Sequence, residues 1–238
     1  MGACVVTITD RLAAVLAAVP ATQTGHQAPR PRFSRTDDCE RALVLDFAHP
    51  RARDMNNPRY ILAASVGTVV GEVLERAAKS LGAIVQERVV LAPMTGNLDV
   101  RWPDRTGLGF ANEVWDWKVV GDKAWKRVAG PRGEPNRKHV VQVNAYAVAT
   151  NARRWALLYL RGRSIFGDEL EWRVHTGAAD PHLALAAQEK WQRVEAHVKA
   201  GTLPVIPDGY DPARFPCGWC GHKERCHGAA EEDASDAA

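Results

Sequence analysis

The sequence predicts an α/β fold in which one mixed sheet is flanked by helices. A long helical pattern over residues 61–81 gives way to three short runs of β-branched and aromatic residues, and helical and strand-like runs then alternate to residue 200. A sheet must bury its apolar faces under other elements, so this order is typical of an α/β domain. With 238 residues, 46% of them hydrophobic, the chain is long enough for one domain with a sizeable core.

The first third of the chain is expected to be mainly helical. Residues 7–20 suit a short helix, and residues 21–35, rich in Pro, Thr, Gln and Arg, are expected to form a mobile link. Residues 39–47 are also expected to be helical. The clearest helix spans 61–81, where apolar spacing predicts one buried face made of Val66, Val69, Val70, Val73, Leu74 and Ala77.

The remaining elements follow in order. Strands are expected at 84–91, 96–102, 113–120, 155–160 and 170–174. Helical segments are expected at 122–128, 139–150 and 181–200, with a polar loop at 130–137. The predicted organisation is an N-terminal helix and link (1–35), one α/β domain (36–228) and a disordered acidic tail (229–238).

The charge distribution favours nucleic acid as a partner. The last ten residues hold four carboxylates and no cation, and removing these four from a net charge of +3 leaves +7 on residues 1–228. A basic body is typical of nucleic-acid binding, although many enzymes share it. The chain has no apolar run of about 18 residues and no basic segment before the apolar stretch 12–19, so we expect neither a membrane partner nor a secretory signal.

Three of the five cysteines form the pattern Cys-x₂-Cys-x₅-Cys at Cys217, Cys220 and Cys226. An odd count with such clustering indicates a metal centre in a reducing, cytoplasmic compartment rather than a disulfide framework. A fourth ligand is required. From the residues alone, zinc bound by three cysteines and His222 or His227 is favoured, because Cys₃His is a common structural site.

The segment around residues 99–118 suggests a hydrolytic site. Asp116 and Lys118 are two apart on a predicted strand, so they share one face, whereas Trp115 and Trp117 take the other face toward the core. Asp99 lies on the preceding strand, where hairpin pairing can bring it alongside Asp116. Two carboxylates and a lysine suit Mg²⁺- or Mn²⁺-dependent phosphodiester hydrolysis. The alternative is a surface salt bridge, which an isolated Asp-x-Lys triplet favours.

The order of these features resembles the RecB-like exonucleases of the PD-(D/E)XK superfamily, particularly CRISPR-associated and AddB-type members and their phage relatives. In that family an N-terminal Cys is followed by Gly-Thr-x-x-His, Gly-x-x-Asp, Asp-x-Lys, Gln-x-x-x-Tyr and Cys-x₂-Cys-x₅-Cys. The likeness covers roughly residues 33–228, and the matching positions are Cys39, Gly67-Thr68, Gly96-x-x-Asp99, Asp116-x-Lys118, Gln142-x-x-x-Tyr146, Cys217, Cys220 and Cys226.

The resemblance implies a restriction-endonuclease-like PD-(D/E)XK core with an iron–sulfur centre. Cys39 would be the fourth ligand and would join the N-terminal helix to the C-terminus, 178 residues away from Cys217. Four thiolates would favour a 4Fe–4S cluster over zinc. The implied ligands are Cys39, Cys217, Cys220 and Cys226, and Cys4 is expected to be a bystander.

The resemblance also assigns roles in the hydrolytic site. Asp99 and Asp116 would bind the metal together with the main-chain carbonyl of Trp117, and Lys118 would be the catalytic lysine. Two further catalytic candidates lie four residues apart on one helical face and would contact the DNA backbone or steady the lysine: Gln142 and Tyr146. The alternative for this pair is a tyrosine packed in the core with the glutamine at its rim.

One position departs from the family pattern. Gly71 stands where the family has its helix histidine, and glycine has no side chain to bind a metal. Glu72 is adjacent and could replace the histidine if the helix were rotated by about 100°. The alternative for Glu72 is a solvated helix residue.

These observations predict a metal-dependent DNA exonuclease that acts on single-stranded or duplex DNA ends. Family membership would place it in recombination, phage replication or CRISPR adaptation, with a homo-oligomer or a recombination or CRISPR protein as partner. The alternative is a catalytically weak or inactive iron–sulfur DNA-binding module of the same fold.

Overall fold

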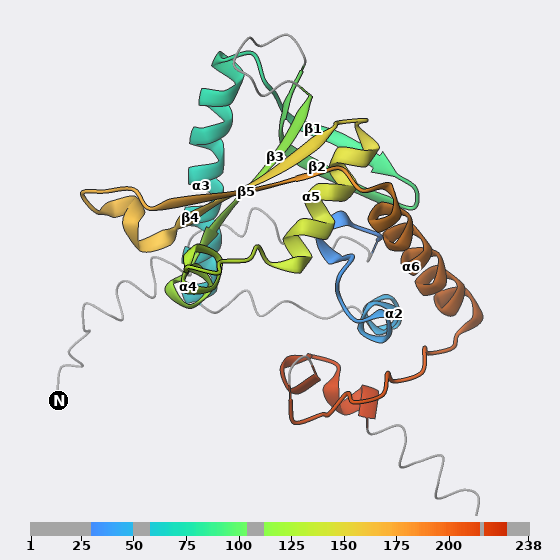
Figure 1. Ribbon diagram of the computed structural model, residues 1–238. Helices are drawn as coiled ribbons and strands as arrows, with labels where there is room; N and C mark the ends of the chain where they lie inside the picture. Colours follow the sequence, from blue (N-terminus) through green and yellow to red (C-terminus); the bar gives the residue numbers. More distant parts are fainter. Residues whose placement is uncertain (1–29, 50–57, 104–111, 215–216, 228–238) are drawn as a thin grey trace, which may run out of the picture.

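The computed structural model describes residues 30–49, 58–103, 112–214 and 217–227 (Figure 1). They form one five-stranded sheet whose strands follow the chain order: β1 (Ile84–Leu91), β2 (Met94–Trp102), β3 (Glu113–Val120), β4 (Arg154–Arg161) and β5 (Trp172–Ala178). β3 and β4 are parallel, whereas the other neighbours are antiparallel. A parallel pair needs a crossover, and α4 (Asp122–Ala129) and α5 (Arg137–Ala149) lie in it.

Helices cover both faces of the sheet (Figure 1). α3 (Pro58–Ser80) packs on one face through a small core that includes Ala78 and Trp102. α5 packs on the other face, with α6 (Pro181–Ala200) and α2 (Glu40–Ala48) beside it. The main core on that side joins all three helices to the sheet. The predicted mixed α/β sheet flanked by helices is therefore confirmed.

Local sequence signals explain where the long helices begin and end. The side chain of Asp180 accepts hydrogen bonds from the amides of His182 and Leu183, and Pro181 follows at the first helical position. α6 ends at Gly201, whose φ of 66° is a left-handed conformation that glycine adopts without strain. Asn136 caps α5 by accepting from the amide of Lys138.

Most predicted boundaries shift by a few residues only. The segment 122–128 is a full helix, α4, and the strand expected at 170–174 runs instead from Trp172 to Ala178. The link expected at 21–35 is wrong at its end, because residues 33–35 form a 3-10 helix, η1 (Phe33–Arg35), and Phe33 is only 1% exposed. The expected helix 7–20, Cys4 and the tail 229–238 lie outside the described residues.

The predicted buried face of α3 is wrong in part. Val69 and Val73 are 59% and 51% exposed. Val66, Val70 and Leu74 are half-buried and lie on the same stripe as Ala78, which packs in the small core. Apolar residues occur around more than one side of this helix, so their spacing could not decide which stripe meets the sheet.

The C-terminal segment returns to α2. It contains one 3-10 helix, η3 (Cys217–Trp219). Another 3-10 helix, η2 (Gly162–Phe166), lies elsewhere in the chain, between β4 and β5. Arg41 of α2 donates hydrogen bonds to the carbonyls of Pro204 and Cys226 at 2.7 and 3.1 Å. The two ends of the described chain therefore lie side by side. Among the described residues, no helix has the length and apolar character needed to cross a membrane.

Candidate functional site

The pairing of β2 with β3 brings two acidic residues together. Val100 lies opposite Trp115 in this antiparallel pair, so the next position along each strand places Asp99 opposite Asp116. The side chain of Asp99 accepts a hydrogen bond of 3.0 Å from the main-chain amide of Trp117. The predicted proximity of the two aspartates therefore follows from the strand register.

Asp116 lies at the centre of this group. It is 1% exposed, and its Oδ2 lies 2.6 Å from the Lys118 ammonium in an ion pair. The pairing with Lys118 offsets part of the cost of burying this carboxylate. Trp115 and Trp117 pack on the α3 side of the sheet, as predicted for the opposite face of β3.

The buried charges strongly perturb one another. Burial, with the charge of Asp116, raises the pKa of Asp99 to about 7, although Lys118 and the Trp117 amide oppose the rise. Burial also raises the pKa of Asp116 against the opposing effect of Lys118. Burial alone would lower the pKa of Lys118, but the two carboxylates outweigh it and raise the value. Two carboxylates facing one ammonium leave a net negative site that a cation would stabilise.

Gln142 and Tyr146 connect α5 to these strands. Gln142 Nε2 lies 3.4 Å from Asp116 Oδ1, so the glutamine contacts the carboxylate rather than Lys118. Tyr146 is 3% exposed, and its hydroxyl donates a 2.8 Å hydrogen bond to the carbonyl of Asn97. The burial of Tyr146 agrees with the core-packing interpretation. A catalytic role for either residue stays a prediction.

Glu72, the predicted substitute for the family histidine at position 71, does not face the two aspartates in a described contact, whereas Glu75 lies near Gly71. Glu72 is exposed on α3, and only its main-chain carbonyl has a described contact, with Arg76. A Cβ added at Gly71 would lie 3.8 Å from Oε1 of Glu75. The charge of Glu75 also contributes to the raised pKa of Asp99. The sequence interpretation overlooked Glu75, which lies one helical turn beyond the family position.

The four cysteines of the predicted cluster are all free thiols. Burial raises the pKa of the Cys217 thiol, and the charges of Cys226, Cys39 and Cys220 add to the rise. Arg41 Nε donates a 3.1 Å hydrogen bond to the sulfur of Cys226. A cation on a sulfur suits a centre whose ligands are thiolates, so the donor set fits a thiolate-bound metal. The remaining ligands would be Cys39 and Cys220.

A buried ion-pair network links the cysteine segment to α2. His222, between Cys220 and Cys226, is 4% exposed, and its Nε2 lies 2.6 Å from Asp46 Oδ1. Asp46 also pairs with Arg35 at 2.5 Å. Asp46 holds Nε2 of His222, so Nδ1 is the ring atom through which this histidine could bind zinc.

Among the described residues, no three His, Cys, Asp or Glu side chains already form a metal-binding arrangement. A metal at either centre would require side chains to turn toward it. The donor set at the carboxylate site fits a hard divalent cation, because Asp99 and Asp116 offer two carboxylates against one ammonium.

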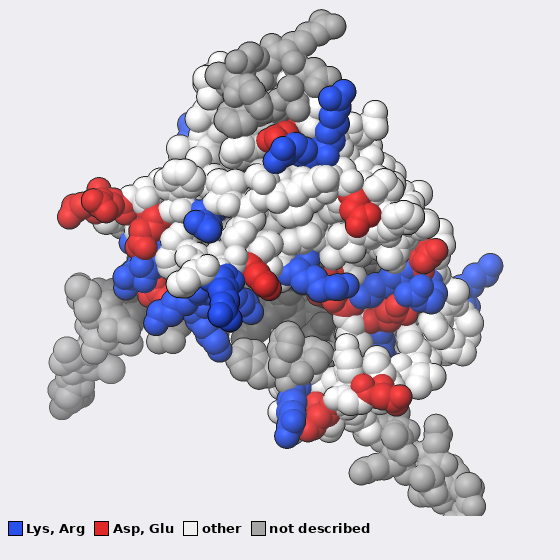
Figure 2. Space-filling model, viewed as in Figure 1, with Lys and Arg blue, Asp and Glu red and all other residues white. Residues whose placement is uncertain are grey.

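A basic surface adjoins the carboxylates. Figure 2 shows Lys and Arg side chains gathered over α4, whose exposed cations are Lys123, Lys126 and Arg127. Burial, with the charges of Lys118, Lys138 and Arg127, lowers the pKa of His139 to about 4. His139 is therefore neutral near pH 7, and its Nδ1 lies 2.9 Å from the hydroxyl of Tyr159.

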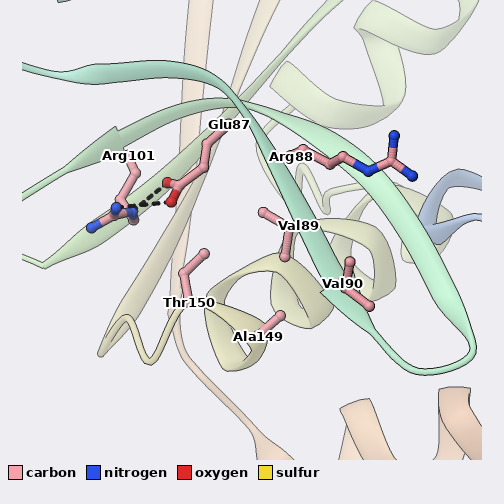
Figure 3. Close-up of a pocket in the computed structure, with 7 residues that line it drawn as sticks. All are labelled: Glu87, Arg88, Val89, Val90, Arg101, Ala149 and Thr150. Atoms are coloured by element: carbon pink, nitrogen blue, oxygen red, sulfur yellow. Dashed lines mark hydrogen bonds and ion pairs between the residues drawn. The ribbon is translucent and has the colours of Figure 1, made fainter.

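A shallow hollow on the outer part of the sheet is separate from this site. It is lined by β1 and β2 residues with Ala149 and Thr150 of α5. In Figure 3, Glu87 and Arg101 point toward each other and form an ion pair with two hydrogen bonds. The side chain of Arg88 extends away from the hollow. None of the predicted site residues lines it.

Comparisons with known proteins give only distant structural likenesses. No protein-family model and no curated protein match the chain. The alkaline exonuclease LHK-Exo from Laribacter hongkongensis shares 14% identity at a TM-score of 0.49, over 73% of this chain and 91% of that one. A phage-related exonuclease from Haemophilus somnus 129PT shares 12% at 0.44, over 71% and 96%. SSO0001 shares 14% at 0.46, over 79% and 87%.

Proposed function

We propose that this protein is a metal-dependent deoxyribonuclease that hydrolyses phosphodiester bonds at DNA ends. The observation that carries the proposal is the group of two carboxylates and one lysine: Asp99 lies opposite the buried Asp116, and Lys118 pairs with Asp116 at 2.6 Å. A buried acidic pair with one lysine is poorly satisfied as an ordinary salt bridge. It suits a cation site at which a phosphate group is bound and cleaved.

Each residue of the site would have its own role in binding the metal or the phosphate. Asp99 and Asp116 would bind Mg²⁺ or Mn²⁺, with the Trp117 carbonyl as a further ligand, because these ions prefer oxygen. Such an ion supplies an activated water and stabilises negative charge on the phosphoryl oxygens. Lys118 would hold a phosphate oxygen or orient the attacking water. Gln142 would keep Asp116 in position through its contact with Oδ1.

The basic surface supports DNA as the substrate. The exposed cations Lys123, Lys126 and Arg127 on α4 adjoin the site through His139 and can bind backbone phosphates. The resemblance to RecB-like exonucleases supports DNA ends as the point of attack. It also supports a role in recombination, phage replication or CRISPR adaptation.

For the cysteine centre we propose a 4Fe–4S cluster bound by Cys39, Cys217, Cys220 and Cys226. The Cys-x₂-Cys-x₅-Cys spacing and the hydrogen bond from Arg41 to Cys226 support it. Its role would be structural, because it would connect α2 to the C-terminal segment and close a long loop.

The decisive experiment follows cleavage of end-labelled DNA by anaerobically purified protein with Mg²⁺, Mn²⁺ or neither ion. Cation-dependent release of nucleotides that is lost in Asp116→Asn supports the proposal. The rival function is a non-catalytic DNA-binding module. Retained DNA binding without cleavage under every condition would establish the rival.

A further inference from the structure

We propose that His139 of α5 binds the DNA directly, by donating a hydrogen bond from Nε2 to a phosphate oxygen held beside Lys118. Tyr159 of β4 is the residue that positions the ring for this contact. The inference rests on the proposed function, because it adds a ligand for the phosphate to the same site.

The strand register places Tyr159 next to the site. β3 and β4 are parallel, and Lys118 lies opposite Tyr159 in this pair. Partners in neighbouring strands project from the same face of a sheet, so the tyrosine shares the face that carries Lys118 and Asp116. The hydroxyl of Tyr159 lies 2.9 Å from Nδ1 of His139. The ring of His139 therefore lies on this face, at the strand that neighbours Lys118.

The helical spacing of α5 places the same ring independently. His139 and Gln142 are three residues apart, so they lie on one face of the helix. Nε2 of Gln142 is 3.4 Å from Oδ1 of Asp116, so this helix face is turned toward the carboxylates. Burial and then the charge of Lys118 lower the pKa of His139, which agrees with this placement. Contacts to two strands, β3 and β4, thus locate His139 near the lysine.

The hydrogen bonds of Tyr159 define which nitrogen of His139 carries the ring proton. The hydroxyl oxygen accepts a 3.1 Å hydrogen bond from the main-chain amide of Asn136. Tyr159 is buried, so its own proton needs an acceptor within the protein, and Nδ1 of His139 lies within reach. An Nδ1 that accepts leaves the proton of the neutral ring on Nε2. The other tautomer would give the buried hydroxyl two donors and no described acceptor.

Nε2 of His139 is available to a ligand. Within the described part of the chain, the hydrogen bond of this ring is the one at Nδ1, and Nε2 has none. His139 is half-buried, and its Nε2 is not among the buried side-chain nitrogens that lack a hydrogen bond. The N–H group at Nε2 is therefore accessible to solvent, in an orientation that Tyr159 maintains.

The charges around the ring favour an anion as that ligand. Besides burial, three cations act on the pKa of His139: Lys118, Lys138 and Arg127. The pKa of about 4 keeps the ring neutral at pH 7, so it adds a directional donor without a further positive charge. A phosphodiester carries one negative charge and two acceptor oxygens, and it matches a neutral N–H group surrounded by cations.

The test measures binding of DNA in which one phosphate at a time is replaced by an uncharged methylphosphonate. Fluorescence anisotropy with the anaerobically purified full chain, with Ca²⁺ in place of Mn²⁺, gives the affinity. At one position we expect the replacement to weaken wild-type binding about ten-fold, because a hydrogen bond to a charged group is lost, and to leave His139→Ala unaffected. Such a position-specific loss would not arise from a merely structural role.

Three further variants separate the donor from the ring. His139→Gln keeps an N–H donor and should recover most of the affinity that His139→Ala loses. Tyr159→Phe should lose part of the affinity, because the orientation of the ring is no longer maintained, and should bind Mn²⁺ like wild type in a calorimetric titration. His182→Ala removes an exposed histidine of α6 and is the matched control, which should bind DNA like wild type.

Cleavage of the same DNA with Mn²⁺ distinguishes the two possible failures. If His139→Ala keeps the wild-type methylphosphonate pattern while Asp116→Asn abolishes cleavage, the role of His139 is overturned and the proposed function stands. Equal losses in His139→Ala and His139→Gln would also overturn the donor role. If the wild type cleaves nothing with any cation, the proposed function fails, and the binding series still decides whether His139 holds a phosphate.

Discussion

The hydroxyl of Tyr146 donates a 2.8 Å hydrogen bond to the carbonyl of Asn97, which follows Gly96 and precedes Asp99 by two residues. This contact joins the Gln-x-x-x-Tyr helix to the Gly-x-x-Asp strand. Gly96 makes it possible, since a Cβ there would lie 2.7 Å from the Tyr146 hydroxyl and 2.9 Å from Cδ2 of Phe33. The two motifs are thus parts of one packing arrangement behind the carboxylates.

Gly96→Ala should therefore destabilise the protein by roughly 1–3 kcal/mol, because the added methyl group overpacks a filled core. It should also reduce nuclease activity, since β2 carries Asp99. Gly67→Ala is the control: nothing lies within 4 Å of a Cβ there, and alanine favours helix. Thermal or urea unfolding would measure both. A Gly96→Ala protein as stable as wild type would contradict the packing argument.

The raised pKa of Asp99 predicts how stability depends on pH without divalent cations. Its pKa rises from 3.8 to about 7 on folding, so the folded protein binds this proton more tightly than the unfolded chain. The stabilisation is fully present below the unfolded value and is lost as the pH rises through about 7. Stability should fall by roughly 2–3 kcal/mol between about pH 5 and about pH 8.

Asp99→Asn should flatten this dependence, because asparagine does not titrate. Melting temperatures in cation-free buffers across that range would show the difference. Added Mn²⁺ should restore wild-type stability at the higher pH, where Asp99 is ionised. A wild-type protein whose stability is constant or rises over the range would refute the assignment to Asp99.

Lys118→Met should lower the nuclease activity but increase the stabilisation that Mn²⁺ gives to the folded protein. Removing the ammonium leaves Asp116 as an unpaired buried charge, which costs roughly 3–5 kcal/mol at neutral pH. Activity should fall about 10²–10³-fold, whereas Mn²⁺ should stabilise this variant more than wild type. Lys123→Met on exposed α4 should change stability by less than about 0.5 kcal/mol. Nuclease assays and melting curves with and without Mn²⁺ would test these expectations.

Much of the fold could be predicted because it depends on local periodicity. The two-residue repeat of β3 was enough to place Asp116 and Lys118 on the face away from Trp115 and Trp117. The antiparallel pairing of β2 with β3 then placed Asp99 beside Asp116. The rotation of α3 was not predictable, because apolar residues on several sides of a helix do not identify the buried stripe. The interpretation therefore chose Glu72 and missed Glu75.

Contacts between distant parts of the chain could not be predicted from the sequence either. His222 and Asp46 are 176 residues apart, and each alone resembles an ordinary surface residue in the sequence. Phe33 appeared to belong to a mobile link because its neighbours are polar or Pro, yet it packs 4.6 Å from the ring of Tyr146. Such pairings are set by tertiary packing.

The last prediction distinguishes the iron–sulfur centre from a zinc site. A Cys₃His zinc site would use Nδ1 of His222, whose Nε2 is held by Asp46, or His227, whose Nε2 is buried and has no hydrogen bond among the described residues. A four-thiolate cluster needs Cys39 instead. The two alternatives therefore depend on different residues, and each can be removed separately.

We expect Cys39→Ala to lose iron, sulfide and the visible absorption of thiolate-bound iron, and to melt at a markedly lower temperature, because metal binding is coupled to folding. His227→Ala should keep all three properties. Metal and sulfide analysis of anaerobically purified proteins, with melting curves, would decide the matter. Stoichiometric zinc without iron in the wild type, lost in His222→Ala or His227→Ala and kept in Cys39→Ala, would establish the Cys₃His site.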